Sequence, residues 1–374
     1  MSAPIASITC HRARISPKTE WIFVRAATAD GLVGWGEGTL SSREGAVAAA
    51  VAGLAASLTG AVPQPGVRRA GAADDLARWA AASAVDMALC DVAARARGKP
   101  AAALLGGVRT AQIPVYANIN RRTVERSPAG FAASARLALA AGHQRFKLAP
   151  FDGLTPALSM TGEGRPLVEA GLARIAAVRA AVGTLPVMVD CHWRFAADAV
   201  PALVGALAEH AVSWLECPIP EDGGSPPVLA RLRAQANARG MALAGCETQT
   251  TPESFAAFLD AGAYDVVMPD VKYVGTLDAM LRIGELAERA RARSAPHNPS
   301  GPIAHAASLH VCAASGGEPL LELQFDESPL FDELVGGPFA PVAHGAIAAL
   351  AAPGLSVAID EATLARLAPA GAAQ

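Results

Sequence analysis

The sequence predicts an α/β barrel preceded by an α+β segment. The barrel is predicted from a series of apolar runs and from the regular spacing of the residues that end them. Seven short apolar runs in the middle of the chain each end on a residue capable of acid, base or metal chemistry. These residues are Lys147, Asp190, Glu216, Glu247, Asp270, His297 and Glu322. The gaps between them are 43, 26, 31, 23, 27 and 25 residues, and each gap accommodates one strand, one helix and two short loops. Because barrel strands end at one mouth, the sequence predicts a shared pocket for these side chains.

The N-terminal part of the chain has a different pattern. Residues 5–40 are extended in character, and residues 29–31 form a turn between two β-rich runs, which is typical of a hairpin. Residues 42–58 and 72–97 are rich in alanine at helical spacing, and the second run closes on glycine and proline. The sequence therefore predicts a separate α+β domain over residues 1–112.

From residue 113 onward strands and helices alternate, which predicts a barrel domain over residues 113–335. Its first strand covers 113–120. The expected helices cover 127–141, 164–182, 196–210, 225–240, 251–262, 275–293 and 301–315. The segment 336–374 is rich in proline and alanine and contains one strand-like run, LSVAID at 355–360. We expect this segment to pack back on the N-terminal domain.

Composition narrows the class of protein. Of the 374 residues 52% are hydrophobic and 17% charged, which suits a large core and argues against disorder. The net charge is −3 without a basic cluster, so no nucleic-acid partner is expected. The six cysteines form no C-x-x-C motif, and the N-terminus lacks the long apolar stretch of a signal peptide. The uncharged stretch 338–359 is interrupted by proline and glycine, so we do not expect it to span a membrane. Cysteines beside strand ends that pack as small apolar residues suggest a reducing, cytoplasmic environment.

Three of the carboxylates predict a metal site. Asp190, Glu216 and Glu247 end three successive strands, and three carboxylates in one pocket would repel one another. A hard divalent cation removes that repulsion, and Mg²⁺ prefers oxygen ligands while keeping positions open for water or substrate. The sequence therefore predicts an Mg²⁺ site, with Mn²⁺ as a possible substitute.

Motifs along nearly the whole chain resemble those of the enolase superfamily in its mandelate racemase-like branch. They are GLVGWGEGTL, AVDMALCDVAARARGKPAAALLGG, FKLAP, VDCH, LECPIPE, GCET, VVMPD, APHNPSGPIAHAASLH and LLELQ. The resemblance implies a modified (β/α)7β TIM-like barrel with an α+β N-terminal capping domain. It also implies that Asp190, Glu216 and Glu247 hold Mg²⁺, to which a substrate carboxylate binds, and that a base removes the neighbouring proton. Residues 16–21 would form a lid over the mouth.

Asp270 and His297 match the Asp–His dyad of this branch. A carboxylate bonded to one ring nitrogen fixes the tautomer and raises the basicity of the other, so His297 is predicted to be the base. Lys272 is the competing candidate for the base. The related muconate-lactonizing enzymes carry their catalytic lysine at the position of Asp270, two residues earlier, so we interpret Lys272 as non-catalytic.

Two further residues bear on the type of reaction. Racemases of this branch carry Lys-x-Lys, but here the run is Lys147-Leu148-Ala149, so the base for the opposite face is missing. Lys147 is still predicted to neutralise the substrate carboxylate. His192 lies two residues after Asp190, and strand alternation puts it on the same face. In the acid-sugar dehydratases of the family, a histidine at this place resembles a general acid for the departing hydroxyl.

The resemblance also matches Glu322 to a glutamate that hydrogen-bonds the substrate carboxylate or the enediolate. The resulting hypothesis is a galactonate dehydratase-like lyase that acts on an aldonate or aldarate. The alternatives are an epimerase, racemase or cycloisomerase that uses the same enediolate, and a metal-binding protein without turnover. The expected partners are a small carboxylate substrate and, by resemblance, further copies of the same chain.

Overall fold

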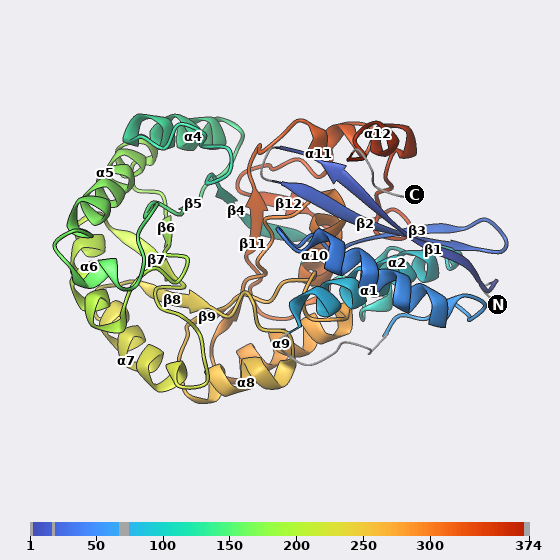
Figure 1. The fold of residues 1–374 in the computed structure, drawn as a ribbon, viewed down its shortest axis with the longest axis horizontal. Helices are drawn as coiled ribbons and strands as arrows, with labels where there is room; N and C mark the ends of the chain where they lie inside the picture. The colour runs from blue at the N-terminus through green and yellow to red at the C-terminus, as the bar shows by residue number, and fades with distance from the viewer. Residues whose placement is uncertain (1–2, 17–18, 67–74, 370–374) are drawn as a thin grey trace.

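The computed structural model describes residues 3–16, 19–66 and 75–369, which form a curled barrel beside a smaller domain (Figure 1). The predicted lid residues 17 and 18, the start of the predicted helix at 72–74, and 370–374 of the tail lie outside the described residues. No helix of the described part is long and apolar enough to cross a membrane.

The smaller, capping domain is a three-stranded antiparallel sheet covered by helices (Figure 1). Its elements are β1 (Ile5–Arg14), β2 (Glu20–Thr28), β3 (Val33–Glu37), α1 (Glu44–Leu58), α2 (Leu76–Ala96) and α3 (Ala101–Leu104). The alternating glycines of the sequence let α2 lie directly on β3. A Cβ added to Gly34, Gly36 or Gly38 would overlap a carbonyl oxygen of α2. Only glycine permits so close an approach of two backbones.

The barrel has eight parallel strands joined by seven helices, in agreement with the expected (β/α)7β pattern. The strands are β4 (Gln112–Asn118), β5 (Phe146–Leu148), β6 (Val187–Asp190), β7 (Val212–Glu216), β8 (Ala242–Gly245), β9 (Val266–Val267), β10 (Arg293–Ser294) and β11 (Leu321–Gln324). The helices are α4 (Pro128–Ala140), α5 (Arg165–Val182), α6 (Val200–Glu209), α7 (Ser225–Asn237), α8 (Pro252–Asp260), α9 (Leu277–Arg289) and α10 (Pro302–Ala314). Short 3₁₀ turns, η1 (Leu158–Met160) and η2 (Ala197–Ala199), precede α5 and α6.

The strand order is β10-β9-β8-β7-β6-β5-β4-β11, which follows the chain except where β11 returns beside β4. β10 and β11 are not paired as neighbouring strands in the described sheet. The segments that contain them are joined by a long hydrogen bond, in which the Glu322 N–H donates to the Pro296 carbonyl over 3.4 Å. Side chains from several strands, the largest of them Tyr116, Met188 and Trp214, fill the barrel interior below the mouth. The barrel interior is therefore packed with side chains, and the mouth of the barrel lies at the carboxyl ends of the strands.

The C-terminal segment corrects one prediction. The run LSVAID (355–360) is not a strand; the strand of this segment is β12 (Ala346–Ala348), which pairs antiparallel with β4. The backbone of the run bonds to side chains of α2 instead: the Leu355 N–H donates to Asp91 and the Val357 carbonyl accepts from Arg95. The short helices α11 (Leu330–Glu333) and α12 (Glu361–Arg366) complete the segment.

One buried carboxylate joins the capping domain to the barrel mouth. Glu37, at the end of β3, accepts hydrogen bonds from the N–H groups of Gly301 (2.8 Å) and Ala304 (3.0 Å) at the start of α10. A carboxylate is favourable at this place because the first N–H groups of a helix lack partners within the helix. The contact fixes the loop that follows β3 over the open end of the barrel.

Candidate active site

The three predicted metal ligands meet at the mouth of the barrel. Asp190 and Glu216 are the last residues of β6 and β7, and Glu247 follows β8 by two residues. One oxygen atom from each carboxylate lies within 4.8 Å of the others, and all three residues are buried. Met188 and Trp214 precede the first two ligands by two residues and fill the interior, so strand alternation turns Asp190 and Glu216 toward the barrel axis.

Glu247 reaches the cluster through a bend in its backbone. Cys246 has a φ of 73°, in the left-handed region that residues other than glycine rarely adopt. The N–H of Cys246 donates to the carboxylate of Glu221 over 2.8 Å, and the hydroxyl of Tyr264 donates to the same oxygen. Strained backbone of this kind persists where surrounding contacts hold it, and it gathers at functional sites.

The electrostatics of the cluster favour a bound cation. Burial, reinforced by the charge of Asp190, raises the pKa of Glu247 to about 8. Burial raises the pKa of Glu216 well above its ordinary value despite the Lys147 ammonium. Burial opposes ionisation of Asp190 as well, but the His192 imidazole and Lys147 lower its pKa to about 2.

One oxygen atom tests whether these residues suit a metal. Oε2 of Glu247 is buried and makes no hydrogen bond among the described residues, the nearest basic atom being Nε2 of His297 at 3.5 Å. A buried, unsatisfied carboxylate oxygen is costly unless a cation or a donor compensates it. Three acidic side chains with oxygen ligands and one unsatisfied atom fit a hard divalent cation such as Mg²⁺.

Lys147 lies at the base of the cluster between two carboxylates. Its Nζ is 2.5 Å from Oε1 of Glu216 and 2.9 Å from Oε1 of Glu322. Although burial opposes the charge, these two carboxylates raise the pKa of Lys147 well above its ordinary value. Glu322 also accepts from the Asn118 side chain (2.7 Å) and from the Asn298 N–H (3.0 Å). Lys147 is thus a fixed cation, and Glu322 accepts from it and from two other donors of the protein.

His297 and Asp270 form the predicted dyad. Nδ1 of His297 is 2.8 Å from Oδ2 of Asp270, and its Nε2 lies 3.5 Å from Oε2 of Glu247. The second ring nitrogen therefore faces the carboxylate cluster. The Lys272 ammonium bonds to the same Asp270 oxygen (2.7 Å) and to the hydroxyl of Ser300. Burial raises the pKa of Asp270, but Lys272 and His297 outweigh it and lower that pKa below its ordinary value.

His192 lies beside the cluster for a different reason than the one predicted. Strand alternation does not apply to it, because β6 ends at Asp190 and His192 has a left-handed φ of 46°. The turn brings Nε2 of His192 to 2.7 Å from Oδ2 of Asp190. The Asp190 charge, opposed by burial, raises the pKa of His192. The predicted proximity is therefore present, but a turn produces it.

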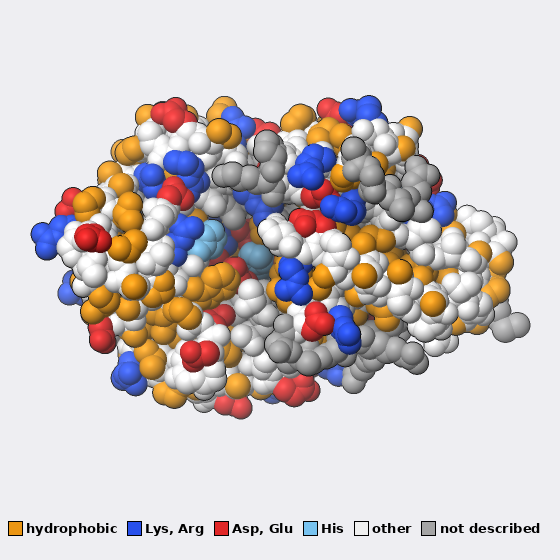
Figure 2. Space-filling model, in the orientation of Figure 1, with side chains coloured by type: hydrophobic (Ala, Val, Ile, Leu, Met, Phe, Trp, Pro, Cys, Tyr) orange, Lys and Arg blue, Asp and Glu red, His pale blue; other side chains and the backbone are white. Residues whose placement is uncertain are grey.

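Six of these side chains line one polar cavity of about 200 Å³. Figure 2 shows a hollow between the barrel and the capping domain, with histidine and acidic side chains in its depth. Besides Lys147, Asp190, His192, Glu247, Lys272 and His297, the lining includes Thr39, Ser41, Asn118, Asn120, Arg121, Tyr273, Pro299 and Gln324. The sequence interpretation missed this second group. The polar residues Asn118, Asn120 and Arg121, at the end of the predicted strand 113–120, were the available signal.

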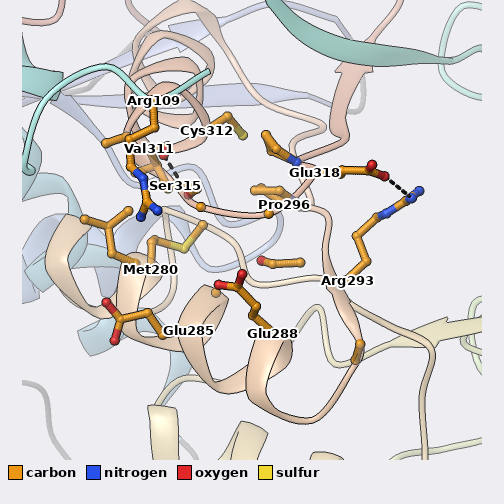
Figure 3. Close-up of a pocket in the computed structure, with 18 of the residues that line it drawn as sticks. Arg109, Met280, Glu285, Glu288, Arg293, Pro296, Val311, Cys312, Ser315 and Glu318 are labelled. Carbon is orange, nitrogen blue, oxygen red and sulfur yellow. Dashed lines mark hydrogen bonds and ion pairs between the residues drawn. The ribbon is translucent and has the colours of Figure 1, made fainter. Parts of the chain in front are cut away.

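A larger cavity of about 660 Å³ lies at the opposite end of the barrel strands (Figure 3). Its lining includes Arg109, Glu285, Glu288 and the ion pair of Arg293 with Glu318 at 3.2 Å. It contains no cluster of three metal-ligating side chains among the described residues. Active sites of such barrels lie at the carboxyl ends of the strands, so the smaller cavity is the candidate active site.

Comparisons with known proteins agree with this fold and site. The enolase C-terminal domain-like family matches residues 130–363, and the mandelate racemase / muconate lactonizing enzyme N-terminal domain matches residues 6–106. D-galactonate dehydratase of Xanthomonas axonopodis pv. citri is 31% identical over 92% of this chain and 90% of its own. That of Ralstonia nicotianae is 30% identical over 93% and 91%. A mandelate racemase/muconate lactonizing enzyme-like protein from Rubrobacter xylanophilus has a TM-score of 0.85 at 27% identity, covering 99% of both chains.

The barrel with its capping domain and the carboxylates at successive strand ends define an enolase-type architecture, and the chain belongs to the enolase superfamily. Within that superfamily it belongs to the mandelate racemase-like branch and is similar to D-galactonate dehydratase. The family resemblance inferred from the sequence motifs is confirmed.

Proposed function

We propose that the protein is an Mg²⁺-dependent acid-sugar dehydratase. It removes the C2 proton of a sugar acid and expels the C3 hydroxyl as water, and the resulting enol ketonises to a 2-keto-3-deoxy acid. The observation that carries the proposal is the placement of two histidines, His297 and His192, in one cavity with the carboxylate cluster. The similarity to D-galactonate dehydratases supports a carbon–oxygen lyase and a sugar-acid substrate.

Asp190, Glu216 and Glu247 would hold the metal ion, which supplies positive charge opposite the substrate carboxylate and the developing enediolate. His297 takes the C2 proton on Nε2, while Asp270 holds Nδ1 and stabilises the imidazolium. His192 gives a proton to the departing C3 hydroxyl, which is a poor leaving group without one.

Lys147 and Glu322 have supporting roles in this proposal. Lys147 adds a fixed positive charge near the substrate carboxylate, and Glu322 holds its ammonium in place. A racemase would need a second base opposite His297. Lys147 is engaged by two carboxylates, and the side chain of Ala149 cannot accept a proton. This arrangement favours elimination over racemisation.

The test follows proton exchange and elimination on the same substrates. A sugar-acid library is screened for keto-acid formation with Mg²⁺ and after chelation, and C2 exchange in D₂O is followed by NMR. Replacing His297→Asn should stop both processes. Replacing His192→Asn should cut keto-acid formation by about 10²–10⁴-fold with a smaller effect on exchange, because exchange needs no leaving-group acid. The exposed His344, replaced by Asn, is the matched control.

Each outcome discriminates between functions. Exchange without keto-acid formation in the wild type would favour an epimerase or cycloisomerase. Equal losses of exchange and elimination in the His192 variant would remove His192 from the role of acid. Absence of both processes on every sugar acid tested would contradict the dehydratase assignment.

A further inference from the structure

The cavity lining divides into a reacting part and a distal part. The carboxylate cluster, His297 and His192 account for the carboxylate, C2 and C3 of a sugar acid under the proposed function. Carbons beyond C3 must therefore contact the remaining lining, which contains two cations, Lys272 and Arg121. The Lys272 side chain is 2% exposed, and its ammonium is occupied by Asp270 and Ser300. Arg121 is the other cation, and its side chain is 30% exposed.

Arg121 is held by a carboxylate that joins three segments of the chain. Asn118 of β4 and Gln324 of β11 are paired in neighbouring strands. Arg121 and Glu327 each lie three residues further along the chain, and Nη1 of Arg121 donates to Oε2 of Glu327 over 3.1 Å. The other oxygen of Glu327 accepts from the hydroxyl of Thr19 in the capping domain (2.5 Å). Glu327 is 8% exposed. The guanidinium is thus oriented before any ligand binds, which lowers the entropic cost of recognition.

The charges around the distal part favour neutral ligand groups. Arg121 is neutralised by Glu327, and Lys272 is neutralised by Asp270. A second carboxylate on the substrate would therefore find no unpaired cation among the described lining residues. A hydroxyl group needs only a donor. One contact of the Arg121 guanidinium is described, so further N–H groups remain for hydroxyl oxygens.

We propose that Arg121 is the specificity-determining residue of the site. It donates hydrogen bonds to the hydroxyl groups beyond C3 and selects a long-chain aldonate over an aldarate. Glu327 and Thr19 act as positioning residues through Arg121. The inference rests on the proposed dehydratase function, and it narrows the substrate class from sugar acids in general to aldonates that carry hydroxyls at the distal end.

The experiment compares three acids: a six-carbon aldonate, a four-carbon aldonate and a six-carbon aldarate, each with Mg²⁺. Replacing Arg121→Met should lower kcat/KM for the six-carbon aldonate by about 10- to 100-fold, mainly through KM, because charge-assisted hydrogen bonds are lost. Turnover of the four-carbon aldonate should change far less. The control is Arg122→Met, which breaks the neighbouring ion pair with Asp326 and does not line the cavity.

A second variant tests the charge argument. Replacing Glu327→Gln keeps the shape and a hydrogen-bond acceptor but frees the charge of Arg121, so activity on the aldarate should rise relative to the aldonate. Binding of the three acids to the His297→Asn protein, measured by calorimetry, gives the same comparison without turnover.

Two results with the Arg121→Met variant would overturn the inference: an equal loss of kcat/KM on both aldonates, or no loss on the six-carbon aldonate. A preference of the wild-type protein for the aldarate would also overturn it. Turnover of the four-carbon acid by the Arg121 variant would show that the dehydratase function stands. Absence of turnover on all sugar acids in the wild type would instead contradict the proposed function.

Discussion

A buried histidine outside the active site should make the stability of the protein depend on pH. His305, in α10, is 1% exposed, bonds to Asn298 over 2.8 Å and contacts the rings of Phe331 and Phe339. Burial lowers its pKa from 6.5 to about 3. The unfolded chain therefore binds more protons than the folded chain between these two pH values. The stability contributed by neutral His305 is present above the unfolded pKa and is lost as the pH falls.

The size of the effect follows from linkage. With those two pKa values, lowering the pH from 7 to 5 should cost about 2 kcal/mol of unfolding free energy for this one side chain. The assay is urea unfolding of wild type and His305→Gln at both pH values. The stability advantage of wild type over the variant should shrink by about that amount at pH 5. His344→Asn, at an exposed position, should show no such change. An advantage of the same size at both pH values would refute the reasoning.

Two further predictions concern the carboxylate cluster. Replacing Glu247→Gln should weaken Mg²⁺ binding measured by calorimetry while leaving the fold intact, because the unsatisfied Oε2 is removed with its charge. Unchanged Mg²⁺ affinity would exclude Glu247 as a ligand. Replacing Lys147→Met should cost about 3–5 kcal/mol in urea unfolding, because Glu216 and Glu322 remain buried without their cation. Adding Glu322→Gln should restore part of that loss, and no restoration would argue against the pairing.

The positions of Asp190 and Glu216 could be predicted because regular strand geometry determines them. Each lies at the end of an apolar run, and parallel strands of a barrel end at the same mouth. Interior residues two positions earlier fix the direction of both side chains. Asp270 and His297 follow two very short strands, β9 and β10. Their 27-residue spacing still predicted that they follow neighbouring strands, and their side chains are 2.8 Å apart.

The remaining parts of the site depend on backbone that has no periodicity. His192 approaches Asp190 through a left-handed turn, which the side-chain alternation of a strand cannot describe. The pairing of Lys272 with Asp270 depends on a loop conformation in the same way. The run LSVAID has the composition of a strand, but tertiary hydrogen bonds to α2 take up its backbone groups. Tertiary context overrides β-propensity in such cases.

Under the proposed function, catalysis and substrate selection depend on different parts of the chain. Asp190 and Glu216 lie at the strand ends, where the packed barrel interior restricts their positions, and His192 and His297 lie in the turns that follow their strands. Arg121 and Glu327 lie in loops after β4 and β11, and Thr19 brings the capping domain into contact with them. Under the inference for Arg121, substitutions in this loop network should change the preferred acid while the distances among Asp190, His192 and His297 stay fixed. For that reason an exchange of Glu327 for glutamine should alter the choice of substrate more than the rate of C2 proton exchange on a short acid.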